Sequence, residues 1–143
     1  MTLNLINDIL SDMWSYDLVL MGILLSLFIL FYSFIIAKRD ELRIIATEIK
    51  NKGIDPTLKL REQHAIAYIK NFQKLNSRCI MLLLVSSIHA VVCWGECRIV
   101  PNECLKAKQI MFYCTCGFSL IITFLLVWQI ILIFKQYKQY TKI

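Results

Sequence analysis

Three long apolar runs dominate the pattern of hydrophobic and polar positions along the chain. Residues 18–37 and 110–134 carry no charged side chain, and residues 79–95 carry one ionisable group besides cysteine, His89. A helix crosses a hydrocarbon core about 30 Å thick with roughly 20 apolar residues. The runs therefore predict three transmembrane helices. A buried helix of a soluble fold is the alternative for 79–95, but its place between two stronger spans favours a crossing.

The segments that flank the first span show helical periodicity instead of continuous apolarity. In residues 1–16 an apolar stripe predicts an amphipathic helix lying on the outer membrane surface, with a disordered tail as the alternative. In residues 38–78 two apolar faces are separated by "GIDP". There Gly53 suits a left-handed helix end, Asp55 an N-cap and Pro56 the first helical turn. This predicts a cytoplasmic helical hairpin that extends the first two spans.

Composition supports this class of fold. The 143 residues are 58% hydrophobic with a mean hydropathy of +0.61, which is too apolar for an ordinary soluble domain. Only 4 Gly and 2 Pro are present, as expected of long helices with few breaks. We therefore expect an all-α integral membrane protein in which residues 1–143 form a single membrane domain.

The basic residues predict the orientation. Of the 16 Lys and Arg residues, none precedes Leu18, ten lie within 38–78, three in 96–109 and three after residue 134. Basic residues favour the cytoplasmic side, so the N-terminus and the 96–109 loop are expected outside and the C-terminus in the cytoplasm. The N-terminal segment does not resemble a signal peptide, because it lacks a basic region and the first apolar run is too long. Richness in Ile, Lys, Asn, Phe and Tyr suggests an AT-rich gene, which fits low-GC bacteria or mobile elements and hence the bacterial inner membrane.

The cysteines gather around the predicted outer loop. The stretch "CWGECRIVPNEC", residues 93–104, separates its cysteines by three and six residues, unlike the Cys-x-x-Cys pair of disulfide-exchange enzymes. Outward loops of bacterial membrane proteins face an oxidising compartment, where cysteines pair. The pattern predicts disulfides that staple the loop and join the second span to the third, with several pairings open. The candidates are Cys93, Cys97, Cys104 and Cys114.

A zinc site is a weaker interpretation of the same region. His89, Cys93 and Cys97 are four residues apart, and Cys104 would complete a tetrahedral set. Gly95 is expected to end the helix before Cys97, however, and thiolate zinc sites belong mainly to reducing compartments. No phosphate-binding loop, nucleophile–base arrangement, paired-carboxylate motif or cofactor signature is present in the sequence. We therefore expect no metal, no cofactor and no enzymatic activity.

Small and polar residues interrupt the spans at helical spacing. Such residues allow membrane helices to approach closely and to form hydrogen bonds, and three helices alone satisfy few of them, which favours a homo-oligomer. They contribute either to helix contacts or to the lining of a pore. The candidates are Ser86, His89, Thr115, Ser119 and Thr123.

A basic stripe approaches the second span from the cytoplasmic side. Lys70, Lys74 and Arg78 recur every four residues and so share one helix face. Contact with lipid head groups is the ordinary role of such a stripe. An acidic cytoplasmic regulatory partner, a nucleotide or a nucleic acid is the alternative.

These observations lead to one functional hypothesis and two alternatives. The first is a small homo-oligomeric ion channel or pore-like effector in the lipid bilayer, gated through its cytoplasmic hairpin. Its compact, AT-rich gene also fits a membrane-acting component of antiviral (phage) defence. The alternatives are an immunity, exclusion or regulatory protein that binds another membrane protein, and a membrane thiol–disulfide oxidoreductase.

Overall fold

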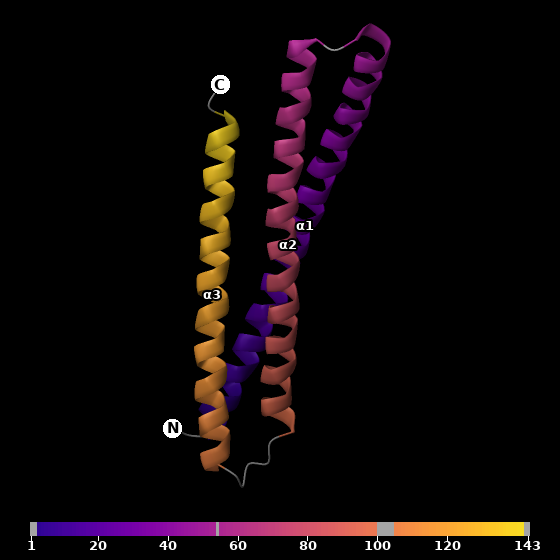
Figure 1. The fold of residues 1–143 in the computed structure, drawn as a ribbon. Coiled ribbons are helices and arrows are strands. Elements are labelled where there is room, and N and C mark those ends of the chain that lie inside the picture. The colour runs from indigo at the N-terminus through magenta and orange to yellow at the C-terminus, as the bar shows by residue number, and fades with distance from the viewer. Residues whose placement is uncertain (1–2, 54, 100–104, 142–143) are drawn as a thin grey trace. The chain divides into compact units, whose positions relative to one another are not determined.

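The structure, a computed structural model, describes residues 3–53, 55–99 and 105–141. It contains three helices: α1 (Leu3–Lys52), α2 (Pro56–Arg98) and α3 (Leu105–Thr141) (Figure 1). No strand occurs among the described residues. All three helices are long and apolar enough to cross a membrane. The prediction of an all-helical chain with three apolar helices of membrane-spanning length is therefore confirmed.

Helix α1 continues without interruption through segments that the sequence analysis treated separately. It includes the expected surface helix at 1–16, the first span and the first arm of the hairpin. Nothing breaks it, because residues 3–52 contain no proline and a single glycine, Gly22. The expectation of a separate surface helix is wrong in this respect. Ile6 and Leu10 of its apolar stripe are buried against Phe112 of α3.

The turn between α1 and α2 follows the predicted chemistry. Gly53 has a φ of 86° and its N–H donates to the carbonyl of Ile49 at 3.0 Å, which closes the end of α1. Asp55 then caps α2: its carboxylate accepts hydrogen bonds from the Thr57 amide at 3.1 Å and the Thr57 hydroxyl at 2.7 Å. These bonds hold the pKa of the exposed Asp55 below its ordinary value. The predicted end, cap and Pro56 start are confirmed.

Helix α2 continues past the point at which the sequence suggested that it ends. Gly95 lies inside the helix, its carbonyl accepts the N–H of Ile99 at 2.8 Å, and α2 ends only at Arg98. One isolated glycine costs a helix about 1 kcal/mol, which is too little to end it when neighbouring turns are packed. The predicted loop at 96–109 is correspondingly shorter, because α3 begins at Leu105.

The chain divides into two compact units. The three-helix unit comprises residues 1–25 and 80–143, and the two-helix unit comprises residues 26–79. In the three-helix unit, Leu20, Leu24, Leu82 and Ile122 form a buried cluster with helices α1, α2 and α3 each contributing. Many large apolar side chains of this unit are nevertheless exposed on its outer surface, for example Leu120 at 73%. Such a surface suits lipid rather than water.

The two-helix unit is held by aromatic and aliphatic packing. Phe72 of α2 packs edge-on against Phe31 and Phe34 of α1, at centroid distances of 5.7 and 5.8 Å, and stacks on Tyr68 at 4.3 Å. Further along the hairpin, Ile45 of α1 is fully buried. Charged side chains face outward, and Arg61 of α2 reaches Glu41 of α1 at 3.9 Å. The apolar faces predicted for 38–78 therefore meet in the structure.

Candidate functional site

A polar stripe occupies the buried face of α2 in the three-helix unit. Ser86, His89, Cys93 and Glu96 follow one another at spacings of three, four and three residues, and none is more than 4% exposed. This spacing keeps them on one face of a helix with 3.6 residues per turn. The interior of the unit is therefore polar along α2, while its outer surface is apolar.

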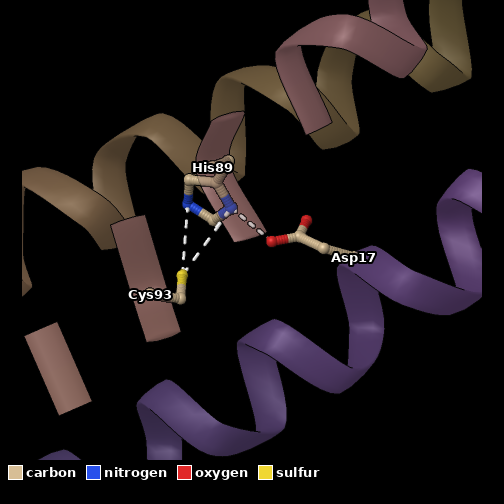
Figure 2. Close-up of side chains that lie close together, drawn as sticks. All are labelled: Asp17, His89 and Cys93. Carbon is tan, nitrogen blue, oxygen red and sulfur yellow. Dashed lines mark hydrogen bonds and ion pairs between the residues drawn. The ribbon is translucent and has the colours of Figure 1, made fainter. Parts of the chain in front are cut away.

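Asp17 of α1 is the partner of this stripe. Its carboxylate oxygen Oδ2 lies 2.6 Å from Nδ1 of His89, and both side chains are 1% exposed (Figure 2). Asp17 shares its helix face with the buried Leu10, Leu20 and Leu24, because it is seven, three and seven residues from them. The periodicity of α1 thus carries one carboxylate into an otherwise apolar seam.

The hydrogen bond of the second ring nitrogen, Nε2, indicates which nitrogen of His89 carries a hydrogen. Nε2 lies 3.2 Å from the backbone carbonyl oxygen of Thr115 in α3. A carbonyl oxygen can only accept, so Nε2 carries the hydrogen and donates it. Nδ1 then shares one proton with the Asp17 carboxylate: the pair is either imidazolium with carboxylate or imidazole with carboxylic acid. In both states the pair has no net charge, which limits the cost of burying it.

Thr115 extends the network to a second carboxylate. Its hydroxyl lies 2.6 Å from Glu96 Oε1 and 3.1 Å from the Met111 carbonyl oxygen, and one hydroxyl hydrogen serves one of these acceptors at a time. Hydrogen-bonded groups from all three helices thus meet around His89. Within the described part of the chain, Asp17 Oδ1, Glu96 Oε2 and Ser86 Oγ are buried without a hydrogen-bond partner.

Cys93 stands beside the imidazole ring. Its Sγ lies 3.8 Å from Nδ1 and 3.9 Å from Nε2 of His89, so it is in line with neither nitrogen (Figure 2). The side-chain donor atoms of Asp17, His89 and Cys93 lie within 4.8 Å of one another, and all three residues are buried. This arrangement is able to hold a proton or a metal ion between the two helices.

Two hollows of the three-helix unit reach the network. One, of about 130 Å³, is lined by Trp14, Cys93 and Cys97 among others. The other, of about 420 Å³, lies along α2 and α3 and is lined by His89, Glu96 and Thr115 among others. Cys93 thus borders the first hollow and His89 borders the second.

The structure divides the predicted pore or helix-contact residues into two groups. Ser86, His89 and Thr115 are buried inside the three-helix unit of a single chain. Ser119 and Thr123 of α3 are partly exposed, and the Thr123 hydroxyl donates to the Ser119 carbonyl at 3.0 Å. The first group makes helix contacts within one chain. The second group is partly exposed, although the Thr123 hydroxyl also lies 3.4 Å from the Tyr16 hydroxyl of α1.

The cysteines of the described residues are not joined by disulfides. Cys93 is buried, Cys97 and Cys116 are partly buried beside Leu10 and Phe112, and Cys114 is exposed. Cys104 lies outside the described residues, so a bridge from Cys97 to Cys104 stays a prediction.

The basic stripe lies in the two-helix unit. Lys70 and Lys74 are exposed and Arg78 is partly exposed. All three lie on α2, and their role as head-group or partner contacts stays a prediction.

Sequence reasoning identified His89 but missed the two carboxylates around it. Asp17 directly precedes the predicted first span at 18–37, and Glu96 falls within the predicted loop at 96–109. Glu96 could have been found from its spacing, because the polar positions of α2 recur on one helix face. Asp17 could have been found as the negatively charged partner that stabilises a buried histidine.

No protein-family model, curated protein or solved structure matches this chain.

Proposed function

We propose that this protein is a small, non-enzymatic channel of the bacterial inner membrane, formed between several copies of the chain. The observation that carries the proposal is the way polar groups are divided in the three-helix unit. Among its buried ionisable groups, Asp17, His89 and Glu96 are hydrogen-bonded inside one chain, whereas Ser119 and Thr123 are partly exposed on a largely apolar outer surface.

The burial of the ionisable groups within one chain supports a stable subunit rather than a pore through one chain. On the C-terminal side of Asp17 along α1, the interior of the three-helix unit is filled by the buried side chains of Leu20, Leu24, Leu82 and Ile122. Ions do not pass through a dry, close-packed aliphatic cluster. This packing supports a conducting path between chains rather than through one chain.

The partial exposure of Ser119 and Thr123 supports α3 as the helix that lines the proposed conducting path. Ser119 and Thr123 are one turn apart, and the Thr123 hydroxyl is bonded within its own helix. Bonded in this way, it still offers acceptor lone pairs to water or to a cation. Around them, Leu120 and Phe124 are 73% and 67% exposed and suit contact with lipid or with a neighbouring chain.

The two-helix unit is proposed as the gate. Helices α1 and α2 each contribute residues to both units, which supports a gate that acts through these two helices. The exposed basic residues Lys70 and Lys74 supply a surface on which an acidic head group or cytoplasmic ligand acts.

The proposal is tested by counting subunits and recording currents. The full chain is reconstituted in lipid nanodiscs for native mass spectrometry and in planar bilayers for conductance. We expect more than one copy per particle and discrete current steps. Ser119→Trp should reduce the single-channel current, whereas Leu120→Trp, on the same helix but with an exposed side chain, should leave it unchanged. A chain that is monomeric and silent in bilayers, or currents that respond equally to both variants, would contradict the proposal.

A further inference from the structure

Three side chains with metal-binding chemistry meet at one end of the three-helix unit. Asp17 comes from α1, and His89 and Cys93 come from successive turns of α2 (Figure 2). Their oxygen, nitrogen and sulfur donors all lie within 4.8 Å of one another. Each residue is at most 1% exposed, so the donors are removed from competing water.

The hydrogen-bonding pattern leaves a position for a positive centre between two of these donors. Because Nε2 of His89 donates to the Thr115 carbonyl, one proton is shared between Nδ1 and the Asp17 carboxylate oxygen 2.6 Å away, and a metal ion that binds both atoms replaces that proton. Two acceptor atoms this close repel each other unless a proton or a metal ion lies between them. The other carboxylate oxygen of Asp17 is buried without a hydrogen-bond partner among the described residues.

We propose that Asp17, His89 and Cys93 bind one divalent transition-metal ion, and that zinc is the ion they fit best. Thiolate and imidazole donors favour zinc over magnesium and calcium, which prefer all-oxygen sites. When the ion binds, the thiol proton of Cys93 and the proton shared by His89 and Asp17 leave. One carboxylate, one thiolate and a dication then carry no net charge, which suits an apolar surrounding.

The distances show which side chains have to move when the ion binds. Tetrahedral zinc with ordinary bond lengths holds nitrogen and sulfur about 3.6 Å apart and nitrogen and oxygen about 3.3 Å apart. The Sγ–Nδ1 distance of 3.8 Å is near the first value, but Sγ lies 3.9 Å from Nε2 as well, so the Cys93 side chain has to turn toward the Nδ1 side of the ring. The Oδ2–Nδ1 distance of 2.6 Å has to open when the ion replaces the shared proton.

The surroundings of the three residues have the second shell that metal-bound histidines usually have. The free ring N–H of a ligating histidine commonly donates to a backbone carbonyl or carboxylate, which fixes the ring and its tautomer. Thr115 supplies that carbonyl at 3.2 Å. The fourth position is left to a water or to the unpartnered Asp17 oxygen, and the hollow lined by Trp14, Cys93 and Cys97 gives access to it.

The site differs from the zinc set that the sequence suggested as a weaker interpretation. That set combined His89 and Cys93 with Cys97 and Cys104, and lacked Asp17. In the structure Asp17 takes the place of the third ligand. The proposal also competes with a disulfide at Cys93, because one sulfur cannot serve both.

The experiment uses the full chain in detergent, purified with a mild reductant, stripped with a chelator and titrated with Co²⁺ as a spectroscopic probe. We expect about one Co²⁺ per chain, intense visible bands of tetrahedral cobalt and a thiolate-to-cobalt charge-transfer band in the near ultraviolet. Zinc should displace the cobalt stoichiometrically. The measurement needs no bilayer and no current, so it is independent of the channel proposal.

Variants separate this site from the other cysteines. Cys93→Ser should abolish the charge-transfer band, and Asp17→Asn and His89→Gln should each weaken zinc binding at least about 100-fold, more than a second-shell change does. Cys114→Ser, an exposed cysteine on α3, is the matched control and should bind as the unmodified chain does. The proposal is overturned if the unmodified chain shows no thiolate band, which needs no variant to fold. It is also overturned if the band persists in Cys93→Ser, or if mass spectrometry finds Cys93 in a disulfide that resists mild reduction.

Discussion

The three-helix unit and the hairpin residues 38–78 of the two-helix unit both bury aliphatic side chains, but they differ in where their ionisable side chains lie. The three-helix unit encloses Asp17, His89 and Glu96 and exposes leucine, isoleucine and phenylalanine. The hairpin encloses Ile45, Leu58 and Ile69 and exposes lysine, arginine and glutamate. The same helical geometry thus serves two solvents. What differs is which side chains the surrounding medium accepts, and the predictions below test that difference in order of decreasing expected effect.

Removing one partner of the buried pair should have the largest effect. His89→Leu leaves the Asp17 carboxylate buried and unpaired, and we expect the free energy of unfolding to fall by about 3–5 kcal/mol. The double variant Asp17→Leu/His89→Leu should recover most of this loss, because no charge is left unpaired. Unfolding is followed by circular dichroism in detergent with a chelator present. A single variant as stable as the double variant would show that the pair is not buried as described.

Truncation of equally buried aliphatic residues should distinguish the two solvents. Ile45→Ala in the hairpin should cost about 2–4 kcal/mol, as it does in water-soluble cores. Leu24→Ala in the three-helix unit should cost less, because lipid tails are as apolar as leucine and only packing is lost. Both side chains are fully buried, so the two variants are matched. Stability is measured in the same lipid nanodisc. A larger loss for Leu24→Ala would contradict a lipid surrounding for the three-helix unit.

The turn between α1 and α2 should show a smaller effect of backbone conformation. Gly53 has a φ of 86°, so Gly53→Ala should cost about 1–2 kcal/mol. Gly22→Ala is the control: Gly22 lies inside α1 and an added Cβ meets nothing within 4 Å, so this change should be neutral or stabilising. Thermal unfolding of both variants checks the contrast, which a loss of stability in Gly22→Ala alone would reverse.

The smallest expected effect is the pH dependence of the α2 cap. The pKa of Asp55 is lowered by the hydrogen bonds from Thr57, so the folded state favours the carboxylate. Its contribution is therefore complete above the ordinary aspartate pKa, about 4, and is lost as the pH falls through the lower value of the folded state. Asp55→Asn keeps a capping side chain that does not titrate. The stability difference between the two chains should shrink on acidification; a difference independent of pH would exclude this role.

Local features were predictable from the sequence and the buried network was not. The turn at Gly53, Asp55 and Pro56 depends on neighbours within a few residues, and it was predicted residue by residue. The Asp17–His89 bond joins residues 72 positions apart, and local periodicity does not reveal which helix faces which. The helix end predicted at Gly95 was wrong, because the packing of the turns around Cys93 and Glu96 outweighs the free-energy cost of one glycine in a helix. The apolar runs, by contrast, were long enough to predict three helices unambiguously.

The Asp17–His89 bond also determines how α1 and α2 are aligned along their axes. Aliphatic side chains in lipid gain little by choosing one neighbour over another, so leucine contacts alone would let two such helices slide. A slide of one turn would bring Val85 or Cys93 opposite Asp17, and neither supplies a positive charge or the shared proton. A single polar residue in an apolar seam fixes the register of coiled coils in the same way. One hydrogen bond thus selects a single alignment from several that the apolar surfaces would accept.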